Sequence, residues 1–174
     1  MLKQLCTLLC CLAIASLSAC GQENKPSPPA KAECNFDSGK SVKIAYSSPR
    51  MKGRKIFGGL VPYGQVWRAG ANEATTFVTD SDITVGGAKV PAGSYTLFAL
   101  PNADKWQLVI SKKTGEWGTA YPGPSNDLAR IDMKVSPLSS PMENFTISFD
   151  HAASTCTLNM SWESTKASVD ISAK

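Results

Sequence analysis

The chain has 174 residues, of which 43% are hydrophobic and 18% are charged, so it is long and apolar enough to fold as one domain around a core. Its net charge of +4 is too small to favour a nucleic-acid partner. Its single histidine, His151, belongs to no cluster of His, Cys and carboxylate residues at zinc spacing, so we expect neither a metal nor a cofactor.

The N-terminus has the order of a secretory signal, because Lys3 precedes an apolar run over residues 5–19. That run is shorter than the roughly 20 residues that a transmembrane helix needs. It ends in LSAC, which resembles the bacterial lipobox, and the resemblance implies that Cys20 is acylated and becomes the first mature residue. The alternative is a buried or disulfide-bonded cysteine behind an ordinary cleavage site.

We therefore expect residues 1–19 to be a signal peptide and Cys20 to hold the protein on a membrane, since two or more acyl chains anchor stably. The expected location is the cell envelope, as an exported lipoprotein on the periplasmic or outer-membrane face. The next segment, GQENKPSPPAK at residues 21–31, is rich in proline and has no large apolar side chain. It predicts a lipidated N-terminus and flexible spacer over residues 20–33 and a single domain over residues 34–174.

Two cysteines remain once the signal is removed and Cys20 is lipidated, namely Cys34 and Cys156. In an oxidising compartment, a pair near opposite ends of a domain indicates one disulfide. Closing so long a loop stabilises the fold by about 4 to 5 kcal/mol through lost chain entropy. The alternative is two free thiols, which a thiol titration of the unreduced protein detects.

Beyond Cys34 the hydrophobic residues mostly alternate with polar or small ones, which indicates strands with one face inward. The alternating sets are Val42, Ile44 and Tyr46; Ile131, Met133 and Val135; Phe145, Ile147 and Phe149; Leu158, Met160 and Trp162; and Val169 and Ile171. Residues 74–79, 94–100 and 106–111 add β-branched and aromatic strands. The pair Gly86-Gly87 predicts a tight hairpin, because both central positions of a type I′ turn need positive φ.

Eight or nine short antiparallel strands, with little helix outside the signal peptide, predict an all-β fold, a β-sandwich, with a partly closed β-barrel as the alternative. Two segments, residues 49–71 and 113–129, lack the strand pattern and are long for loops. Loops of that length are usually functional or disordered, and the aromatic residues in both argue against disorder.

A resemblance covers nearly the whole domain, from about residue 41 to residue 171. The resemblance rests on three sequence runs, which are YSSPRMKGRKIFGGLVPYGQVWRAGANEATT at 46–76, VPAGSYTLFALP at 90–101 and WESTKASVDI at 162–171. These runs resemble the bacterial domain of unknown function 2911. The resemblance implies an exported, often lipid-anchored protein and brings no established activity with it.

The first long segment gathers six polar or aromatic residues, namely Arg50, Arg54, Trp67, Arg68, Asn72 and Glu73. Arginine forks suit bidentate recognition of carboxylate or phosphate, and a tryptophan can stack on a sugar face or ring. Glu73 can hold one arginine in place and leave another for a ligand. The alternative is a structural tie, with an internal Arg68–Glu73 ion pair and Trp67 as a core plug.

The second long segment places Trp117 and Tyr121 among glycines and prolines, which favours an aromatic cover over the same ligand. The alternative is packing over an open end of the sandwich. Catalysis has weaker support, because His151 continues an inward-facing strand series and no GxSxG elbow is present. Glu73, Asp127 and Asp132 are the remaining acid–base candidates.

These observations favour a lipid-anchored β-sandwich that binds a small polar or anionic ligand, or a saccharide, over an enzyme. The predicted ligand contacts are Arg50, Trp67, Arg68, Asn72, Glu73, Trp117 and Tyr121. The alternatives are an envelope protein–protein interaction module and a carboxylate-dependent hydrolase. An enzyme is expected to show a concave pocket with raised carboxyl pKa values, and an interaction module a flat aromatic patch.

Overall fold

The computed structural model describes residues 26–117 and 120–173. The predicted signal peptide, residues 1–19, and the predicted lipidation site Cys20 lie outside the described residues. Within the described ranges, no helix has the length and apolar character that crossing a membrane requires.

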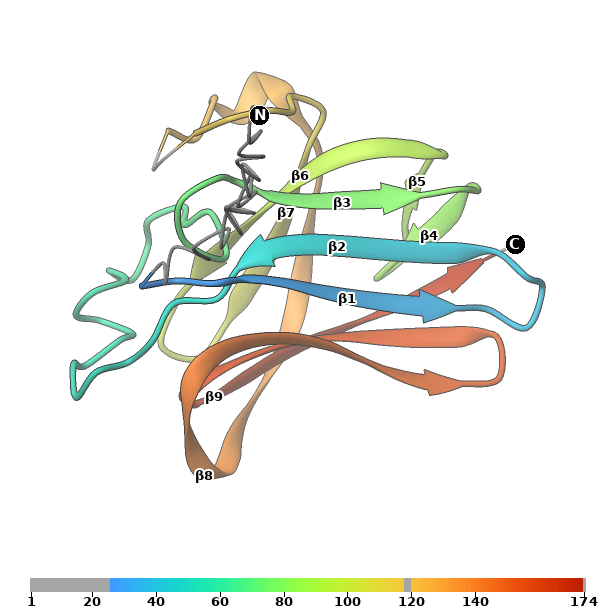
Figure 1. Cartoon of the computed structure of the whole chain (residues 1–174). Coiled ribbons are helices and arrows are strands. Elements are labelled where there is room, and N and C mark those ends of the chain that lie inside the picture. Colours follow the sequence, from blue (N-terminus) through green and yellow to red (C-terminus); the bar gives the residue numbers. More distant parts are fainter. Residues whose placement is uncertain (1–25, 118–119, 174) are drawn as a thin grey trace, which may run out of the picture.

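The described chain is almost entirely β-structure, and all paired strands run antiparallel (Figure 1). The strand order in the sheet is β1-β2-β3-β6-β7-β8-β9-β4-β5. The strands are β1 Pro29–Asn35, β2 Ser41–Ser47, β3 Thr75–Thr79, β4 Ile83–Val85, β5 Ala88–Val90, β6 Gly93–Pro101, β7 Trp106–Ser111, β8 Asp127–Ala152 and β9 Thr155–Ala173. A single turn of 3-10 helix, η1 Pro124–Asn126, precedes β8.

Strand β8 turns this one sheet into two layers. Its first part pairs with β7 up to Met133, and from Lys134 onward it pairs with β9. The pairing with β9 shifts register between Pro137 and Met142 and again before Thr146, and such bulges bend a strand. The sheet therefore folds over on itself as a sandwich-like, all-β fold, as predicted, and it does not close into the barrel that was the alternative.

The prediction of eight or nine short strands is wrong for β8 and β9. Each of them joins two of the predicted strands into one, of 26 residues in β8 and 19 in β9. The stretch of Ser and Pro between Val135 and Phe145 has the composition of a loop, but its backbone keeps an irregular pairing with β9. The predicted hairpin at Gly86 and Gly87 is confirmed, with φ of 51° and 91° at the two glycines.

The domain begins earlier in the chain than residue 34. Strand β1 starts at Pro29, inside the predicted spacer, and pairs with β2 along its whole length. The amide of Ser48 also donates to the carbonyl of Pro28 at 2.9 Å. Proline is tolerated at the first position of an edge strand, because no partner there needs its missing N–H.

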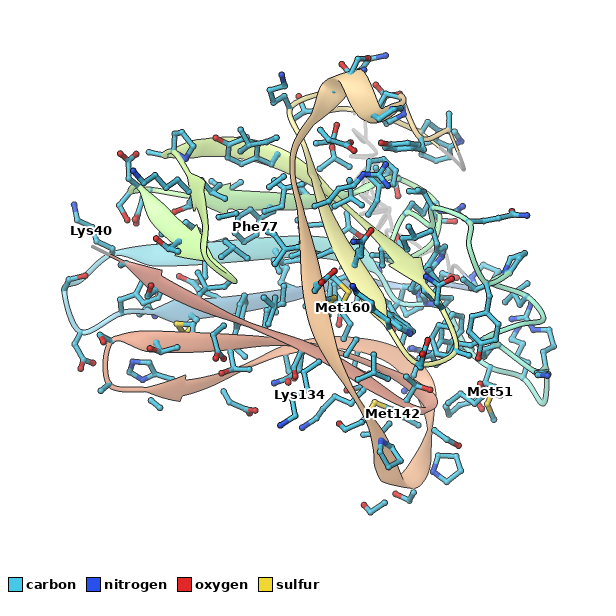
Figure 2. All side chains as sticks on the ribbon, turned by 180° about the vertical axis from the view of Figure 1, so that it is seen from behind. Lys40, Met51, Phe77, Lys134, Met142 and Met160 are labelled. Carbon is cyan, nitrogen blue, oxygen red and sulfur yellow. A yellow bond between two sulfur atoms is a disulfide. The ribbon has the colours of Figure 1, made fainter. Side chains whose placement is uncertain are left out.

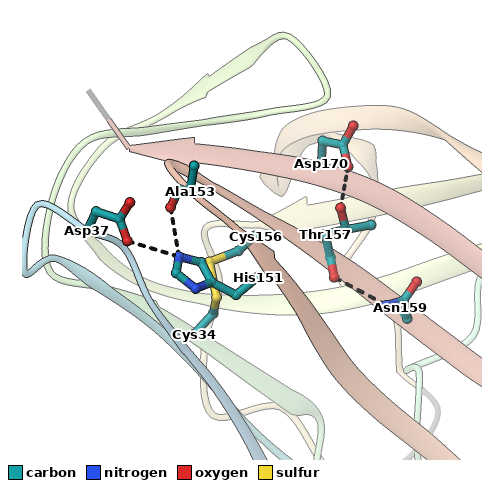
Figure 3. Close-up of a disulfide and its surroundings, with 8 residues drawn as sticks. All are labelled: Cys34, Asp37, His151, Ala153, Cys156, Thr157, Asn159 and Asp170. Atoms are coloured by element: carbon teal, nitrogen blue, oxygen red, sulfur yellow. Dashed lines mark hydrogen bonds and ion pairs between the residues drawn. A yellow bond between two sulfur atoms is a disulfide. The ribbon is translucent and has the colours of Figure 1, made fainter.

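The predicted disulfide between Cys34 and Cys156 is present and buried (Figure 3). It joins edge strand β1 to β9 in the other layer, across 122 residues of chain. His151, which the strand pattern places at the core or its rim, lies exposed beside this bond. Its Nε2 is 2.7 Å from the carbonyl of Ala153 and 3.4 Å from the Asp37 carboxylate.

Candidate ligand-binding site

The first long segment, residues 48–74, joins β2 to β3 at one end of the sandwich (Figure 1). Within it Ile56, Phe57 and Val61 are buried, and the Val61 amide donates to the Ile56 carbonyl at 2.9 Å. The Phe57 ring meets Trp106 edge-on at 4.7 Å between centroids. The turn needs glycine, because a Cβ on Gly59 would lie 2.6 Å from the carbonyl oxygen of Lys55. The buried side chains of the IFGGLV run therefore anchor the segment to the core.

Trp67 is held by both its backbone and its ring. Its amide and carbonyl exchange hydrogen bonds with Ala99 of β6, at 2.7 and 2.8 Å. The half-buried indole stacks on Trp162 at 5.9 Å and meets Phe145 at 4.9 Å. Its Nε1 donates to the Gly70 carbonyl at 3.2 Å. The ring is thus rigidly placed, with one part in the core and another part on a cavity wall.

That cavity has a volume of about 570 Å³, which lies within the range of small-molecule sites. Its wall combines apolar side chains with two guanidinium groups. It is lined by Ser27, Pro49, Arg54, Leu60, Val61, Pro62, Gln65, Val66, Trp67, Arg68, Gly70, Ala71 and Trp162. None of these described lining residues is an Asp, Glu, His or Cys.

Arg68 is the unusual polar group in this wall. Its side chain is half-buried, its Nε is buried, and that Nε has no hydrogen-bond partner among the described residues. Burial lowers the pKa of the Arg68 guanidinium, because a low-dielectric surrounding disfavours the charged form. Within the described ranges no carboxylate forms an ion pair with Arg68, so the predicted alternative of an Arg68–Glu73 tie does not form.

Arg50 and Arg54 both line a second, smaller cavity of about 360 Å³. The two cavities share Ser27 and Arg54 in their walls, so they adjoin. Arg50 Nη1 donates to Ser48 Oγ at 2.9 Å, and Arg54 Nη2 donates to the Arg50 carbonyl at 2.7 Å. These bonds orient both guanidinium groups and use only part of their five donors each.

Asn72 and Glu73 stand behind the cavities and line neither. Asn72 has a left-handed backbone, with φ of 54°, and its Nδ2 donates to the Ser27 carbonyl at 3.2 Å. Glu73 is exposed, and its carboxylate lies 3.5 Å from Ser47 Oγ. Asn72 therefore positions the wall residue Ser27, whereas the side-chain bond of Glu73 goes to Ser47, which lines neither cavity.

Trp117 and Tyr121 do not cover the cavity as the sequence suggests. Trp117 is 68% exposed and pairs by its backbone with Glu73. Tyr121 packs on Phe98 at 5.3 Å, and its hydroxyl donates to the Asp127 carboxylate at 2.7 Å. Arg130 donates to both the Tyr121 hydroxyl and Asp127, each at 2.7 Å. Burial, followed by the bond to Asp127, raises the pKa of Tyr121.

The structure adds Leu60 and Trp162, which sequence reasoning missed, and Arg54, which the sequence gathers in the same segment but not among the predicted contacts. Arg54 and Leu60 carry a signal, because they fall in the same irregular segment as Trp67. Trp162 is predicted only as an inward-facing strand residue. Its place beside Trp67 follows from the position of β9 in the fold, so no local pattern reveals it.

Comparison with known proteins gives a family and no activity. A family model described as a protein of unknown function, DUF2911, matches residues 27–171. No curated protein and no solved structure matches the chain. The matched region runs from Ser27 past Trp162, and so includes every residue that lines the larger cavity.

Proposed function

We propose that this protein, which belongs to the DUF2911 family, binds a small anionic ligand in the cavity beside Trp67 and Arg68. The observation that carries the proposal is Arg68, a half-buried cation on a cavity wall that forms no ion pair within the described residues. A half-buried charge without a counter-ion is costly, and an anionic group bound in the cavity offsets that cost.

The walls indicate what such a ligand looks like. An anionic group, such as a carboxylate or phosphate, suits the guanidinium of Arg68, with Arg54 at the same cavity. The indoles of Trp67 and Trp162 and the side chains of Val61 and Val66 offer an apolar surface to the remainder of the molecule. An anion attached to a ring or sugar face fits this combination better than a small hydrated ion does.

Binding is better supported than hydrolysis. The described lining of the larger cavity contains no group that titrates near neutral pH. Two acid–base candidates from the sequence are engaged elsewhere, since Asp127 pairs with Arg130 and Asp132 pairs with Lys105 at 2.9 Å. Hydrogen bonds from Gln107 and Lys105 hold the pKa of Asp132 low, which suits a charged surface group and not a general acid.

We also propose that the protein is exported and anchored through Cys20. The signal-like N-terminus and the LSAC sequence support this, and a buried disulfide is typical of proteins from oxidising compartments.

The test measures binding of phenyl phosphate, glucose 6-phosphate, inorganic phosphate and uncharged methyl glucoside by calorimetry. We expect phenyl phosphate or glucose 6-phosphate to bind more tightly than both controls. Arg68→Gln should weaken that binding by about 10- to 100-fold, the range for a lost charged hydrogen bond. The matched variant Lys40→Gln, at the other end of the molecule, should bind like the wild type. If Arg68→Gln bound these phosphate esters as tightly as Lys40→Gln does, the proposal would be refuted.

A further inference from the structure

The described chain begins against a basic part of the first long segment. Pro26 and Ser27 line the smaller cavity together with Arg50, Lys52 and Arg54. Hydrogen bonds from Asn72 and Ser48 to Ser27 and Pro28 fix this start in place. In Figure 1 the first residues of β1 lie at the same end of the molecule as this segment.

The position of this start limits how far the domain can lie from its proposed anchor. Cys20 is six residues before Pro26. Six residues span at most about 20 Å when fully extended. A lipid on Cys20 therefore keeps this end of the domain, and not the opposite end, close to the membrane surface.

That end carries a concentration of unpaired positive charge. Residues 49–72 include five basic side chains and no Asp or Glu. Among the described residues, none of these five forms an ion pair. Two carboxylates from other parts of the chain reach this segment and bind its backbone, since Glu143 accepts from the Lys52 amide at 2.8 Å and Glu163 from the Ile56 amide at 3.3 Å. The five residues are Arg50, Lys52, Arg54, Lys55 and Arg68.

Two large apolar side chains project from the same segment. Leu60 is 47% exposed and Tyr63 is 44% exposed. A tyrosine with one apolar and one polar end is suited to the boundary between headgroups and acyl chains. The opposite end differs in charge, because Asp37 and Asp80 flank Lys40 there. Figure 2 shows Lys40 and Met51, which represents the basic segment, at opposite ends.

We propose that residues 50–63, here called the basic loop, dock on the anionic headgroups of the membrane that carries the Cys20 anchor. Lys52 and Lys55 face the phosphate groups, and Leu60 and Tyr63 enter the interfacial layer. The inference rests on the proposed lipidation and is independent of the ligand proposal. Since Arg54 and Leu60 also line the larger cavity, docking brings this part of the cavity wall to the lipid surface.

The test uses the chain from residue 20 onward with Cys20→Ser, which keeps every described strand and cannot be acylated. Cosedimentation is measured with phosphatidylcholine vesicles that contain about 30 mol % phosphatidylglycerol and with vesicles of phosphatidylcholine alone. We expect partitioning onto the anionic vesicles only, and a loss of most of it when salt rises to about 0.5 M, because surface charges are screened.

Charge-reversal variants identify the surface. Each basic residue near an anionic surface contributes about five-fold in partitioning, so Lys52→Glu with Lys55→Glu should reduce it at least about 30-fold. The control pair Lys40→Glu and Lys89→Glu changes the net charge equally at exposed positions away from the loop, and should alter partitioning less than about three-fold. Equal losses in the two double variants would overturn the proposal, since net charge alone would explain them.

Four further measurements keep the outcome decisive. Thermal unfolding confirms that each variant is folded, and Leu60→Ser, which removes no charge, should also weaken partitioning. Inorganic phosphate should displace the protein no better than sodium sulfate of equal ionic strength, and stronger displacement would mean that the loop recognises a soluble phosphate instead. Arg68→Gln, which lies outside the basic loop, should lose binding of phenyl phosphate and keep binding to vesicles. The double variant Lys52→Glu with Lys55→Glu should keep binding of phenyl phosphate and lose binding to vesicles.

Discussion

Each of the two long irregular segments places an aromatic ring beside an arginine, but the surroundings of the two arginines differ. In the first, residues 48–74, Arg68 has no carboxylate partner among the described residues and Trp67 forms a cavity wall. In the second, residues 112–126, Tyr121 packs on Phe98 and is bonded to Asp127 and Arg130. An arginine beside an aromatic ring is thus a candidate site in one place and a structural tie in the other. What decides between a site and a tie is whether a carboxylate lies within hydrogen-bond distance of the arginine.

The second segment also helps to explain why the middle strands bury apolar side chains on both faces. Phe98 and Val109 are buried although they point to the side of β6 and β7 opposite Leu97 and Leu108. Tyr121 covers Phe98 from that outer side. A packing role for this segment therefore describes Tyr121 better than the predicted cover over a ligand. The ring packs on the outer side of β6 and not over an open end of the sandwich.

The largest expected difference lies between the two tryptophans. Trp67→Ala should lower the free energy of unfolding by about 3 kcal/mol, because it removes a ring that contacts Trp162, Phe145 and Phe57. Trp117→Ala should change it by about 0.5 kcal/mol or less, since that ring is 68% exposed. Urea unfolding with the disulfide intact measures both, and equal effects would remove the distinction between the segments.

A smaller difference is expected between the two arginines. Arg130→Met should cost about 2 kcal/mol of unfolding free energy, because it leaves the carboxylate of Asp127, whose side chain is only 9% exposed, without its cation. Arg68→Met should change the same quantity by about 0.5 kcal/mol or less, or raise it, because no ion pair is lost. Lys112→Met is the exposed control for both. A large cost at Arg68 would show that it is a structural tie.

The smallest expected effect is a pH dependence confined to the second segment. The pKa of Tyr121 is raised in the folded state above its ordinary value of 10.0. The folded state therefore holds this proton more tightly, and the resulting stabilisation is complete below pH 10.0 and lost as pH rises through the folded pKa. Tyr121→Phe should lose less stability than the wild type between pH 9 and 11, by urea unfolding. Parallel curves for the two proteins would contradict this assignment.

Much of the fold follows from local pattern. The alternation at Val42, Ile44 and Tyr46 corresponds to β2, and the β-branched and aromatic runs correspond to β3, β6 and β7. Strand β1 was not predicted, because its inward positions hold the small residues Ala30 and Ala32 next to prolines. The continuity of β8 was also missed, because bulged pairing does not need hydrophobic alternation.

The sequence predicted several residues of the first segment that belong to the candidate site, but it did not predict what their side chains contact. Trp67, Arg68 and Arg50 line the two adjoining cavities, as a ligand-binding interpretation of the first segment requires. Asn72 instead bonds to the lining residue Ser27, Glu73 contacts Ser47 outside both cavities, and Tyr121 belongs to the other segment. Neighbours in sequence share a loop, but the direction of each side chain depends on the strands against which that loop packs.

The sequence by itself determined the class of fold, the hairpin at Gly86 and Gly87, the pairing of Cys34 with Cys156 and the segments that depart from strand pattern. These features depend on backbone preference, on period along the chain and on the number of cysteines. Only the tertiary structure decided that Trp162 stacks on Trp67, that Tyr121 packs on Phe98, and that no described carboxylate pairs with Arg68. Those outcomes depend on strand order and register, which bring together residues that are distant in the chain.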